Sequence, residues 1–365
     1  MTACHQFVPM LEPGAVGQHT LEVQRTLRAA GIDSEIFTEF LHPSMEGRAR
    51  LYGEYGTPAW PAHPDDTLLY QFAIGSVVAS FLRSRPERKG LHHHNLTPPE
   101  MLAGWEPQVV PGLRWGRRQL VELASSVDFA LAVSAFNRAD LRDSGFRDVE
   151  IVPILLDVGA FDREVDGAKL RQLEADKADG GADLLFVGRI APNKCQHDLV
   201  KALVAYRRSV DPSARLRLVG GSSSERYLDA VRTFAHSAGV GDSVDFAGSV
   251  SSGELSAYYR SADVFVSASE HEGFCVPLLE AMHHCVPIVA FAAAAIPETL
   301  GEAGVLVSSK APADLAAAVG VVVHDDGHRR RLVAAGTRRL ADFSLERTRA
   351  RLLDVLARHG VGVPS

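Results

Sequence analysis

The feature of this sequence that most constrains its fold is a regular alternation of short apolar runs with segments of helix length. The runs are rich in β-branched and aromatic residues, which is typical of buried strands. They lie at residues 184–190, 216–219, 244–246, 264–266, 288–291 and 305–307. Strands that alternate with helices form a parallel sheet covered on both faces. The second half of the chain is therefore expected to be an α/β domain.

The first half repeats the pattern less regularly. Strands are expected at residues 5–9, 34–37, 68–70, 127–133 and 149–156. A chain of 365 residues also exceeds what one hydrophobic core usually supports, so two domains are expected. Residues 162–181 are charged and poor in large apolar side chains, as in an exposed helix or a linker. The expected division is a domain at 1–160, a linker at 161–181, a domain at 182–342 and a final helix within 343–365.

Composition and charge argue against several classes of function. A net charge of -7 argues against a general nucleic-acid binder. Basic clusters at 83–89 and 114–118 could contact an anionic acceptor or a membrane surface, although solvated clusters of this kind are commoner. No apolar run is long enough to cross a membrane and no signal peptide is apparent, so a cytoplasmic protein is expected. The four cysteines lack the spacing of a zinc site or a disulfide framework.

Two glutamates eight residues apart mark the first candidate site. Glu272 lies in the loop after the strand at 264–266, and Glu280 lies in a helix that Pro277 opens. Phe274 and Cys275 fall at the N-terminus of that helix, where unpaired amides favour an anion or a polar oxygen. Carboxylates accept hydrogen bonds from sugar hydroxyls, so both glutamates could face one ligand. The alternative is one exposed glutamate and one capping glutamate.

A second motif follows the strand at 184–190. Gly188 ends the strand, and Arg189 and Lys194 are spaced to converge on a diphosphate. The alternative is two exposed basic residues in a turn. Gly17 lies in a similar loop after the first strand, where glycine lets the backbone approach a ligand, and a plain tight turn is the alternative there.

Three consecutive histidines, at 92–94, precede Asn95. Alternate residues of a strand point to opposite faces, so the three cannot all face one metal ion. Imidazole suits a sugar hydroxyl or a phosphate as a partner. Histidines that only end a strand remain the alternative.

The run from Glu272 to Glu280, continued by Ala281-Met282 and Val286-Pro287, resembles the Glu-x7-Glu signature of glycosyltransferase family 4. These are retaining, nucleotide-sugar-dependent enzymes. The run from His94 to Pro98 matches the His-Asn-x-Thr-Pro motif of a bacterial subset, and the resemblance covers nearly the whole chain. It implies the GT-B fold, in which two Rossmann-like domains with parallel sheets face a central cleft. It also implies that the helix within 343–365 crosses back to the N-terminal domain.

The resemblance implies a role for each candidate residue. Arg189 and Lys194 would stabilise the leaving diphosphate, so no metal ion would be required. Glu272 and His94 would act at the donor sugar, and Glu280 would bind the ribose. The remaining donor-binding residues would be Gly17, Gly188, Val250, Phe274, Cys275 and Val276. No residue is assigned as a carboxylate nucleophile, because a second carboxylate near the anomeric carbon cannot be located.

The implied reaction moves a hexosyl group from a GDP or UDP sugar to a glycan, a lipid-linked glycan or a small molecule. No nucleic-acid partner is implied, and peripheral contact with the inner face of a membrane stays open. The chain departs from the family where Cys275 replaces a frequent glycine and where Ala15 stands in place of an acidic residue, which puts acceptor activation there in doubt. The alternatives are a nucleotide-sugar epimerase or hydrolase, and a non-catalytic binding protein. A dehydrogenase would require a Gly-x-Gly-x-x-Gly turn after the first strand, and none is present.

Overall fold

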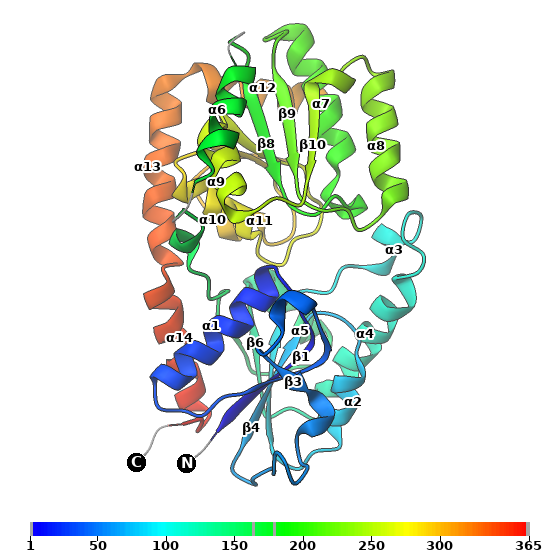
Figure 1. The fold of residues 1–365 in the computed structure, drawn as a ribbon, viewed down its shortest axis with the longest axis vertical. Coiled ribbons are helices and arrows are strands. Elements are labelled where there is room, and N and C mark those ends of the chain that lie inside the picture. The colour runs from blue at the N-terminus through cyan, green and yellow to red at the C-terminus, as the bar shows by residue number, and fades with distance from the viewer. Residues whose placement is uncertain (1–2, 163–164, 178–179, 363–365) are drawn as a thin grey trace. The chain divides into compact units, whose positions relative to one another are not determined.

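The computed structural model describes residues 3–162, 165–177 and 180–362. Its contacts divide the chain into two compact units (Figure 1). Unit 1 comprises Met1–Pro99, Gln108–Leu156 and Phe343–Ser365, and unit 2 comprises Glu100–Pro107 and Asp157–Asp342. The expected ranges 1–160, 161–181 and 343–365 include positions 1–2, 163–164, 178–179 and 363–365, which lie outside the described residues.

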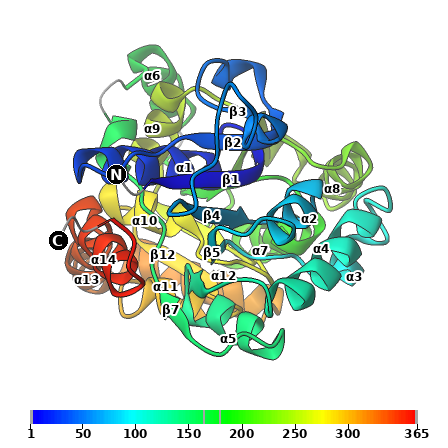
Figure 2. The same ribbon diagram turned by 90° about the horizontal axis from the view of Figure 1, so that it is seen from below.

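Unit 1 contains a parallel sheet of seven strands in the order β3-β2-β1-β4-β5-β6-β7. The labels β3, β2, β1, β4, β5 and β7 follow one another in this order in Figure 2. The strands are β1 (Cys4–Leu11), β2 (Ile36–Leu41), β3 (Arg50–Leu51), β4 (Thr67–Phe72), β5 (Arg88–His93), β6 (Phe129–Ala132) and β7 (Val149–Ile151). The helices that follow them are α1 (Ala15–Ala29), α2 (Val77–Arg83), α4 (Val110–Leu123) and α5 (Ala135–Asp143), with short 3-10 turns η1 (Pro43–Met45) and η2 (Tyr52–Glu54). Every residue of β4 is buried, as expected for a central strand between two helical layers.

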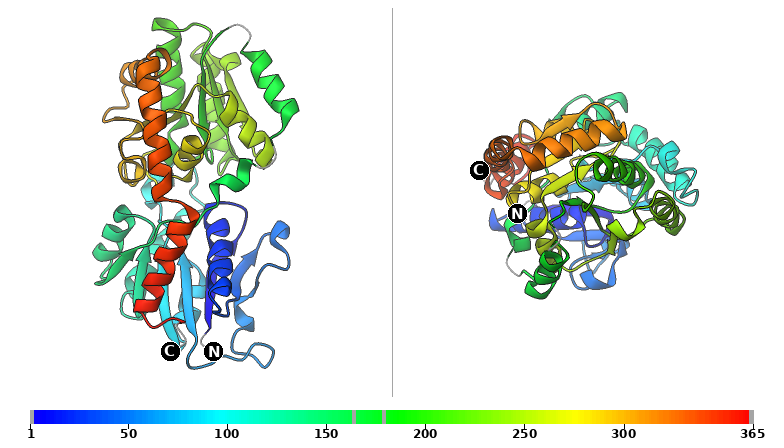
Figure 3. Two further views of the ribbon diagram at one scale, coloured as in Figure 1. Left: turned by 90° about the vertical axis from the view of Figure 1, so that its left-hand side faces the viewer. Right: turned by 90° about the horizontal axis from the view of Figure 1, so that it is seen from above.

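The last helix of the chain, α14 (Leu345–Arg358), belongs to unit 1. Leu352, Val355 and Leu356 are buried in one cluster with residues of β1, α1 and β6. Arg349 is paired with the buried Glu22 of α1, and the left panel of Figure 3 shows the two helices side by side. The C-terminal segment therefore completes the core of the unit that the N-terminus begins.

Unit 2 contains a parallel sheet of six strands in the order β10-β9-β8-β11-β12-β13. Its strands are β8 (Asp183–Val187), β9 (Arg215–Val219), β10 (Val244–Gly248), β11 (Val264–Ser267), β12 (Ile288–Phe291) and β13 (Val305–Val307). Its helices are α6 (Gly167–Asp176), α7 (Gln196–Ser209), α8 (Glu225–Ser237), α9 (Ser252–Ser261), α10 (Val276–His283), α11 (Ile296–Leu300), α12 (Pro312–His324) and α13 (Asp326–Asp342), with 3-10 turns η3 (Val158–Asp162), η4 (Pro192–Lys194) and η5 (Gly241–Ser243). The short helix α3 (Pro99–Leu102) begins at the boundary between the units.

The expected α/β class and the two parallel sheets are confirmed, whereas several strand bounds differ. The strand expected at 34–37 is β2, which begins at Ile36 and extends to Leu41. β3 was not predicted, because a strand of two exposed residues has no apolar pattern. Among the described residues, no helix combines the length and apolar character that a membrane-crossing segment needs.

Candidate active site

The candidate residues of unit 2 lie at the point where its strand order reverses. From β8 the chain proceeds outward to β9 and β10, and β11 then adds to the other side of β8. Open α/β sheets bind ligands at such a point, outside the carboxyl ends of the strands. The loop that carries Arg189 and Lys194 follows β8, and the loop that carries Glu272 follows β11. Adjacent parallel strands thus bring two motifs together that are far apart in the sequence.

Lys194 and Glu272 form an ion pair at the centre of this group. The Lys194 Nζ lies 2.6 Å from the Glu272 Oε2, and the two side chains are 16% and 14% exposed. The loops are also tied through their backbones, because the Glu270 amide donates to the Asn193 carbonyl at 2.9 Å. The Asn193 side chain donates to the His271 carbonyl at 3.3 Å. The two loops therefore hold a cation against a carboxylate in the structure without a ligand.

Arg189 is exposed, and among the described residues its side chain has no ion-pair partner. It follows Gly188, whose φ of 149° lies outside the range that other residues readily adopt. The ends of β8 and β9 approach closely here, since a Cβ on Gly220 would lie 2.2 Å from the Gly188 carbonyl oxygen. The Arg189 guanidinium is thus available to bind an anion at the loop that also carries Lys194.

Glu280 is buried about one turn into α10, with 7% of the residue exposed. The Tyr259 hydroxyl, from α9, donates to the Glu280 Oε2 at 2.7 Å. Burial raises the pKa of Glu280, and the hydrogen bond from Tyr259 opposes that shift. Tyr259 was missed by sequence reasoning, because nothing in the local pattern distinguishes it from the neighbouring buried Tyr258.

Phe274, Cys275 and Val276 form the entry to α10. Cys275 caps the helix in the left-handed region, at a φ of 70°, and Pro277 occupies the first turn. The Thr299 hydroxyl donates to the Phe274 carbonyl at 2.7 Å and so holds the loop from the other side. Burial raises the pKa of the Cys275 thiol, which is therefore uncharged near neutral pH. This region presents backbone rather than charge beside Glu272.

Val250 lies farther from the group. It follows β10, at the edge of the sheet and two strands from β8, and it is half-buried just before Ser251, the N-cap of α9. Strands are spaced by about 4.8 Å, so the end of β10 lies about 10 Å from that of β8. That separation suits a different part of an extended ligand.

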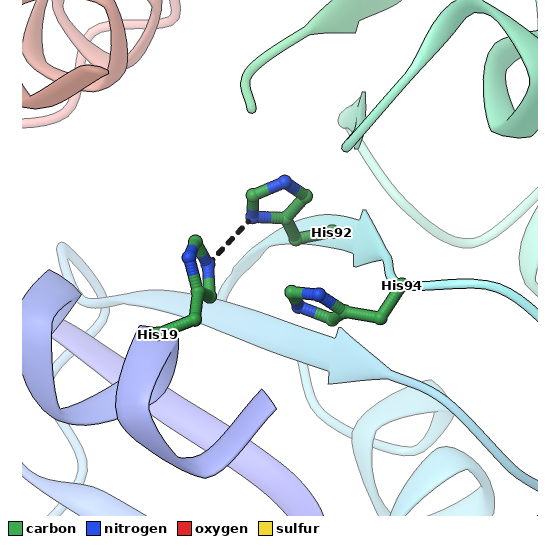
Figure 4. Close-up of side chains that lie close together, drawn as sticks. All are labelled: His19, His92 and His94. Atoms are coloured by element: carbon green, nitrogen blue, oxygen red, sulfur yellow. Dashed lines mark hydrogen bonds between the residues drawn. The ribbon is translucent and has the colours of Figure 1, made fainter. Parts of the chain in front are cut away.

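Gly17 and His94 belong to unit 1. Gly17, expected in the loop after the first strand, instead lies in the first turn of α1. A Cβ on Gly17 would lie 2.0 Å from the Glu12 carbonyl oxygen, so the close approach of the helix to that loop requires glycine here. Figure 4 shows the ring of His94, just past β5, turned toward His92 of β5 and His19 of α1. Each pair of ring centroids lies 4.8 Å apart. His19 was missed by sequence reasoning, because only the fold brings α1 to β5.

The strand alternation expected for the three consecutive histidines is present. His93 points away from the other two and bonds Asp140 at 2.9 Å. Burial lowers the pKa of His92 to about 4. Burial also lowers the pKa of His19 and that of His94 well below the usual value. The rings of His19, His92 and His94, which together form the histidine cluster of unit 1, are therefore neutral at physiological pH.

A cavity of about 360 Å³ adjoins the Lys194 loop within unit 2, and Trp105 and Tyr227 are among the residues that line it. Cys195 and His197 also line the cavity, and together with Asp198 they offer ligand atoms for a metal ion. The Lys310 ammonium already lies 2.9 Å from the Asp198 carboxylate and 3.4 Å from the Cys195 Sγ. Burial raises the pKa of Cys195 to about 11. These side chains therefore favour a structural network around a lysine.

Two doubly wound parallel sheets, with charged loops at a switch point, place the protein in the GT-B class. Solved structures support this fold: a sucrose-phosphate synthase from Thermosynechococcus elongatus has a TM-score of 0.77 at 18% identity, over 98% of this chain and 99% of that one. Anabaena HepE in complex with UDP and glucose has a TM-score of 0.73 at 18% identity, over 98% and 100%.

The sequence comparisons identify the family. Residues 172–339 match the model of glycosyl transferases group 1. A D-inositol 3-phosphate glycosyltransferase of Nocardioides is 32% identical over 95% of this chain and 86% of its own. The protein belongs to the glycosyl transferases group 1 family.

Other relatives align over less of their length. The chain spans 52% of a D-inositol 3-phosphate glycosyltransferase of Geodermatophilus obscurus, at 36% identity over 64% of this chain. It spans 58% of a GDP-mannose-dependent phosphatidylinositol monomannoside mannosyltransferase of Mycobacterium tuberculosis, at 31% identity over 60% of this chain.

Proposed function

We propose that the protein is a retaining hexosyltransferase that moves a hexosyl group from a nucleotide diphosphate sugar to a hydroxyl acceptor, without a metal ion. The observation that carries the proposal is the Lys194–Glu272 pair at the switch point of unit 2. A cation and a carboxylate held 2.6 Å apart supply one group for a diphosphate and one for sugar hydroxyls. The exposed Arg189, in the same loop as Lys194, supplies a second cation.

The chemistry of transfer assigns a role to each charged group. Breaking the bond between the anomeric carbon and the diphosphate oxygen leaves negative charge on the diphosphate. Lys194 and Arg189 act where that charge develops, so they bind the transition state more strongly than the ground state. Only such a difference in binding accelerates the step. The acceptor oxygen bonds the anomeric carbon on the face that the diphosphate leaves, and its proton passes to a diphosphate oxygen. No side chain is required as a nucleophile.

Donor binding must separate the internal ion pair. Lys194 turns from the Glu272 carboxylate to the diphosphate, and the released carboxylate accepts hydrogen bonds from the sugar. Glu280, held by Tyr259, accepts from the ribose hydroxyls. The backbone near Cys275 completes the sugar contacts, and Val250 is the proposed contact to the base. His94, in unit 1, acts on the donor sugar.

The names of the relatives suggest which ligands to test first. One mannosyltransferase relative is named as GDP-mannose-dependent, and HepE was solved with UDP and glucose. Several relatives are named D-inositol 3-phosphate glycosyltransferase. GDP-mannose and UDP-glucose are therefore the first donors, and inositol phosphates the first acceptors. We place the reaction in the cytoplasm, with peripheral membrane contact where the acceptor is lipid-linked.

The test is a thermal-shift screen against GDP, UDP and their sugar conjugates in the presence of a chelator, followed by a transfer assay. A ligand at 100 times its Kd stabilises a fold by about 2.7 kcal/mol, a readable shift. We expect one nucleotide to stabilise the protein and its sugar conjugate to support transfer with retention at the anomeric carbon. Release of free sugar whatever acceptor is supplied would favour the hydrolase or epimerase alternative. Stabilisation without any turnover would favour a binding protein.

A further inference from the structure

The hydrogen bonds of the histidine cluster in unit 1 determine where two of its protons lie. The His19 Nδ1 accepts from the Leu155 amide at 2.9 Å, so the proton of this neutral ring is on Nε2. That Nε2 faces the His92 Nδ1 at 3.2 Å and donates to it. The His92 Nε2 therefore carries the next proton and donates to the Val152 carbonyl at 3.0 Å. Each of these four ring nitrogens therefore either donates or accepts one hydrogen bond, and each has its partner.

A second chain of hydrogen bonds determines the proton of His94. The Thr20 carbonyl can only accept, so the Gln6 amide nitrogen donates to it at 3.0 Å. The Gln6 Oε1 then accepts from the Gln71 amide nitrogen at 2.8 Å. This leaves the Gln71 Oε1 toward His94, whose Nε2 must donate at 2.7 Å. The His94 proton is on Nε2 because Gln71 presents an acceptor there.

Only one lone pair in the cluster is left over. Of the six ring nitrogens of His19, His92 and His94, the His94 Nδ1 alone has no hydrogen-bond partner within the described part of the chain. The three histidines lie close enough to hold a metal ion, but a metal needs a lone pair from each ring, and those of His19 and His92 are already engaged. A buried acceptor without a partner also costs free energy, which a donor from a ligand would recover. The cluster is therefore suited to accepting one hydrogen bond.

We propose that Gln71 is a positioning residue that holds His94 as its Nε2–H tautomer, so that Nδ1 accepts a hydrogen bond from a hydroxyl of the sugar. This inference rests on the proposed function. It also selects between the two partners that an imidazole could have, because a lone pair repels a phosphate oxygen and attracts a hydroxyl. His94 directly follows β5, is 8% exposed and precedes Asn95, whose φ of 106° turns the chain sharply there.

The tautomer can be read directly in the free protein. In ¹⁵N-histidine-labelled protein without ligand, we expect long-range proton–nitrogen spectra to show His94 with an unprotonated Nδ1 and a protonated Nε2. Gln71→Leu should lose that pattern, because neither nitrogen then has a preferred partner. Gln119→Met is the matched control, since Gln119 is also buried in unit 1 and bonds only Ser76 among the described residues. A protonated Nδ1 in the unmodified protein, or an unchanged pattern in Gln71→Leu, would overturn the proposal.

A second variant tests the ligand. The carboxylate of Gln71→Glu raises the pKa of His94 and favours the imidazolium, whose Nδ1 donates instead of accepting. We expect this variant to lose about tenfold in kcat/KM for the donor, with a loss that deepens as pH falls, whereas the parent stays flat. In the parent, the His94 Nδ1 resonance should move on addition of UDP-glucose or GDP-mannose, whichever binds, and stay in place with the nucleoside diphosphate alone. An equal shift with the diphosphate alone would refute the hydroxyl contact.

The two proposals fail in different ways. The tautomer is read without substrate, so an absence of sugar transfer would overturn the proposed function while the spectra still decide the role of Gln71.

Discussion

Replacing Glu272 by glutamine should strengthen the binding of a nucleoside diphosphate while it weakens transfer. In the free protein the Glu272 carboxylate competes with the diphosphate for the Lys194 ammonium, because the two lie 2.6 Å apart. Glu272→Gln removes the competing charge and retains the shape of the side chain. The sugar loses a charged acceptor at the same time. Affinity for the diphosphate and catalytic efficiency should therefore change in opposite directions.

The burial of the Lys194–Glu272 pair sets the size of the expected coupling energy between the two side chains. Exposed ion pairs contribute about 0 to 1 kcal/mol, and breaking a fully buried pair costs about 3 to 5 kcal/mol. Side chains that are 16% and 14% exposed fall between these limits, so we expect a coupling of about 2 kcal/mol. Lys194→Met should then lower the Tm of a unit of roughly 200 residues by about 5 °C. Glu272→Gln should tighten diphosphate binding by up to about tenfold, less than the whole coupling because the amide still contacts Lys194.

The assay is a double-mutant cycle of Lys194→Met and Glu272→Gln, read by calorimetric unfolding and by titration with GDP or UDP. Asp229→Asn is the matched control, because it makes the same charge change at an exposed pair, 3.6 Å from Arg232. The control should alter unfolding by less than about 0.5 kcal/mol. Additive single mutants, or a Glu272→Gln variant that binds the diphosphate more weakly than the parent, would refute the competition between carboxylate and diphosphate.

Three further predictions concern single groups. Tyr259→Phe should destabilise unit 2 by about 1.5 to 3 kcal/mol, because Glu280 loses its hydrogen bond. The loss should also raise the pKa of Glu280 further and so move the acidic limb of the pH profile of donor binding to higher pH. An unchanged pH profile would contradict this. Urea unfolding should show stability falling as pH drops from about 6.5 toward 4, because the unfolded chain takes up protons that the buried His92, with its pKa lowered to about 4, refuses. Gly17→Ala should cost about 1 to 3 kcal/mol, since its Cβ would meet the Glu12 carbonyl, and an unaltered unfolding midpoint would show that the loop relaxes freely.

The local sequence pattern was sufficient to predict those elements whose structure depends on residues that are neighbours in the chain. Short apolar runs indicated the strands of unit 2, because a buried parallel strand needs apolar side chains on both faces. The same logic failed for β3, which is too short and too exposed to show a pattern. It also missed the extension of β2 to Leu41, where burial fades toward the end of the strand.

The sequence by itself determined the α/β class, the two sheets and the loops after β8 and β11 as places for charged residues. Those features follow from periodicity and from short motifs that the chain carries locally. Only the tertiary structure decided that Lys194 meets Glu272, that Tyr259 holds Glu280 and that Gln71 sets the proton of His94. Each of these contacts joins residues on different elements. Their distances depend on strand order and helix packing, which no local pattern records.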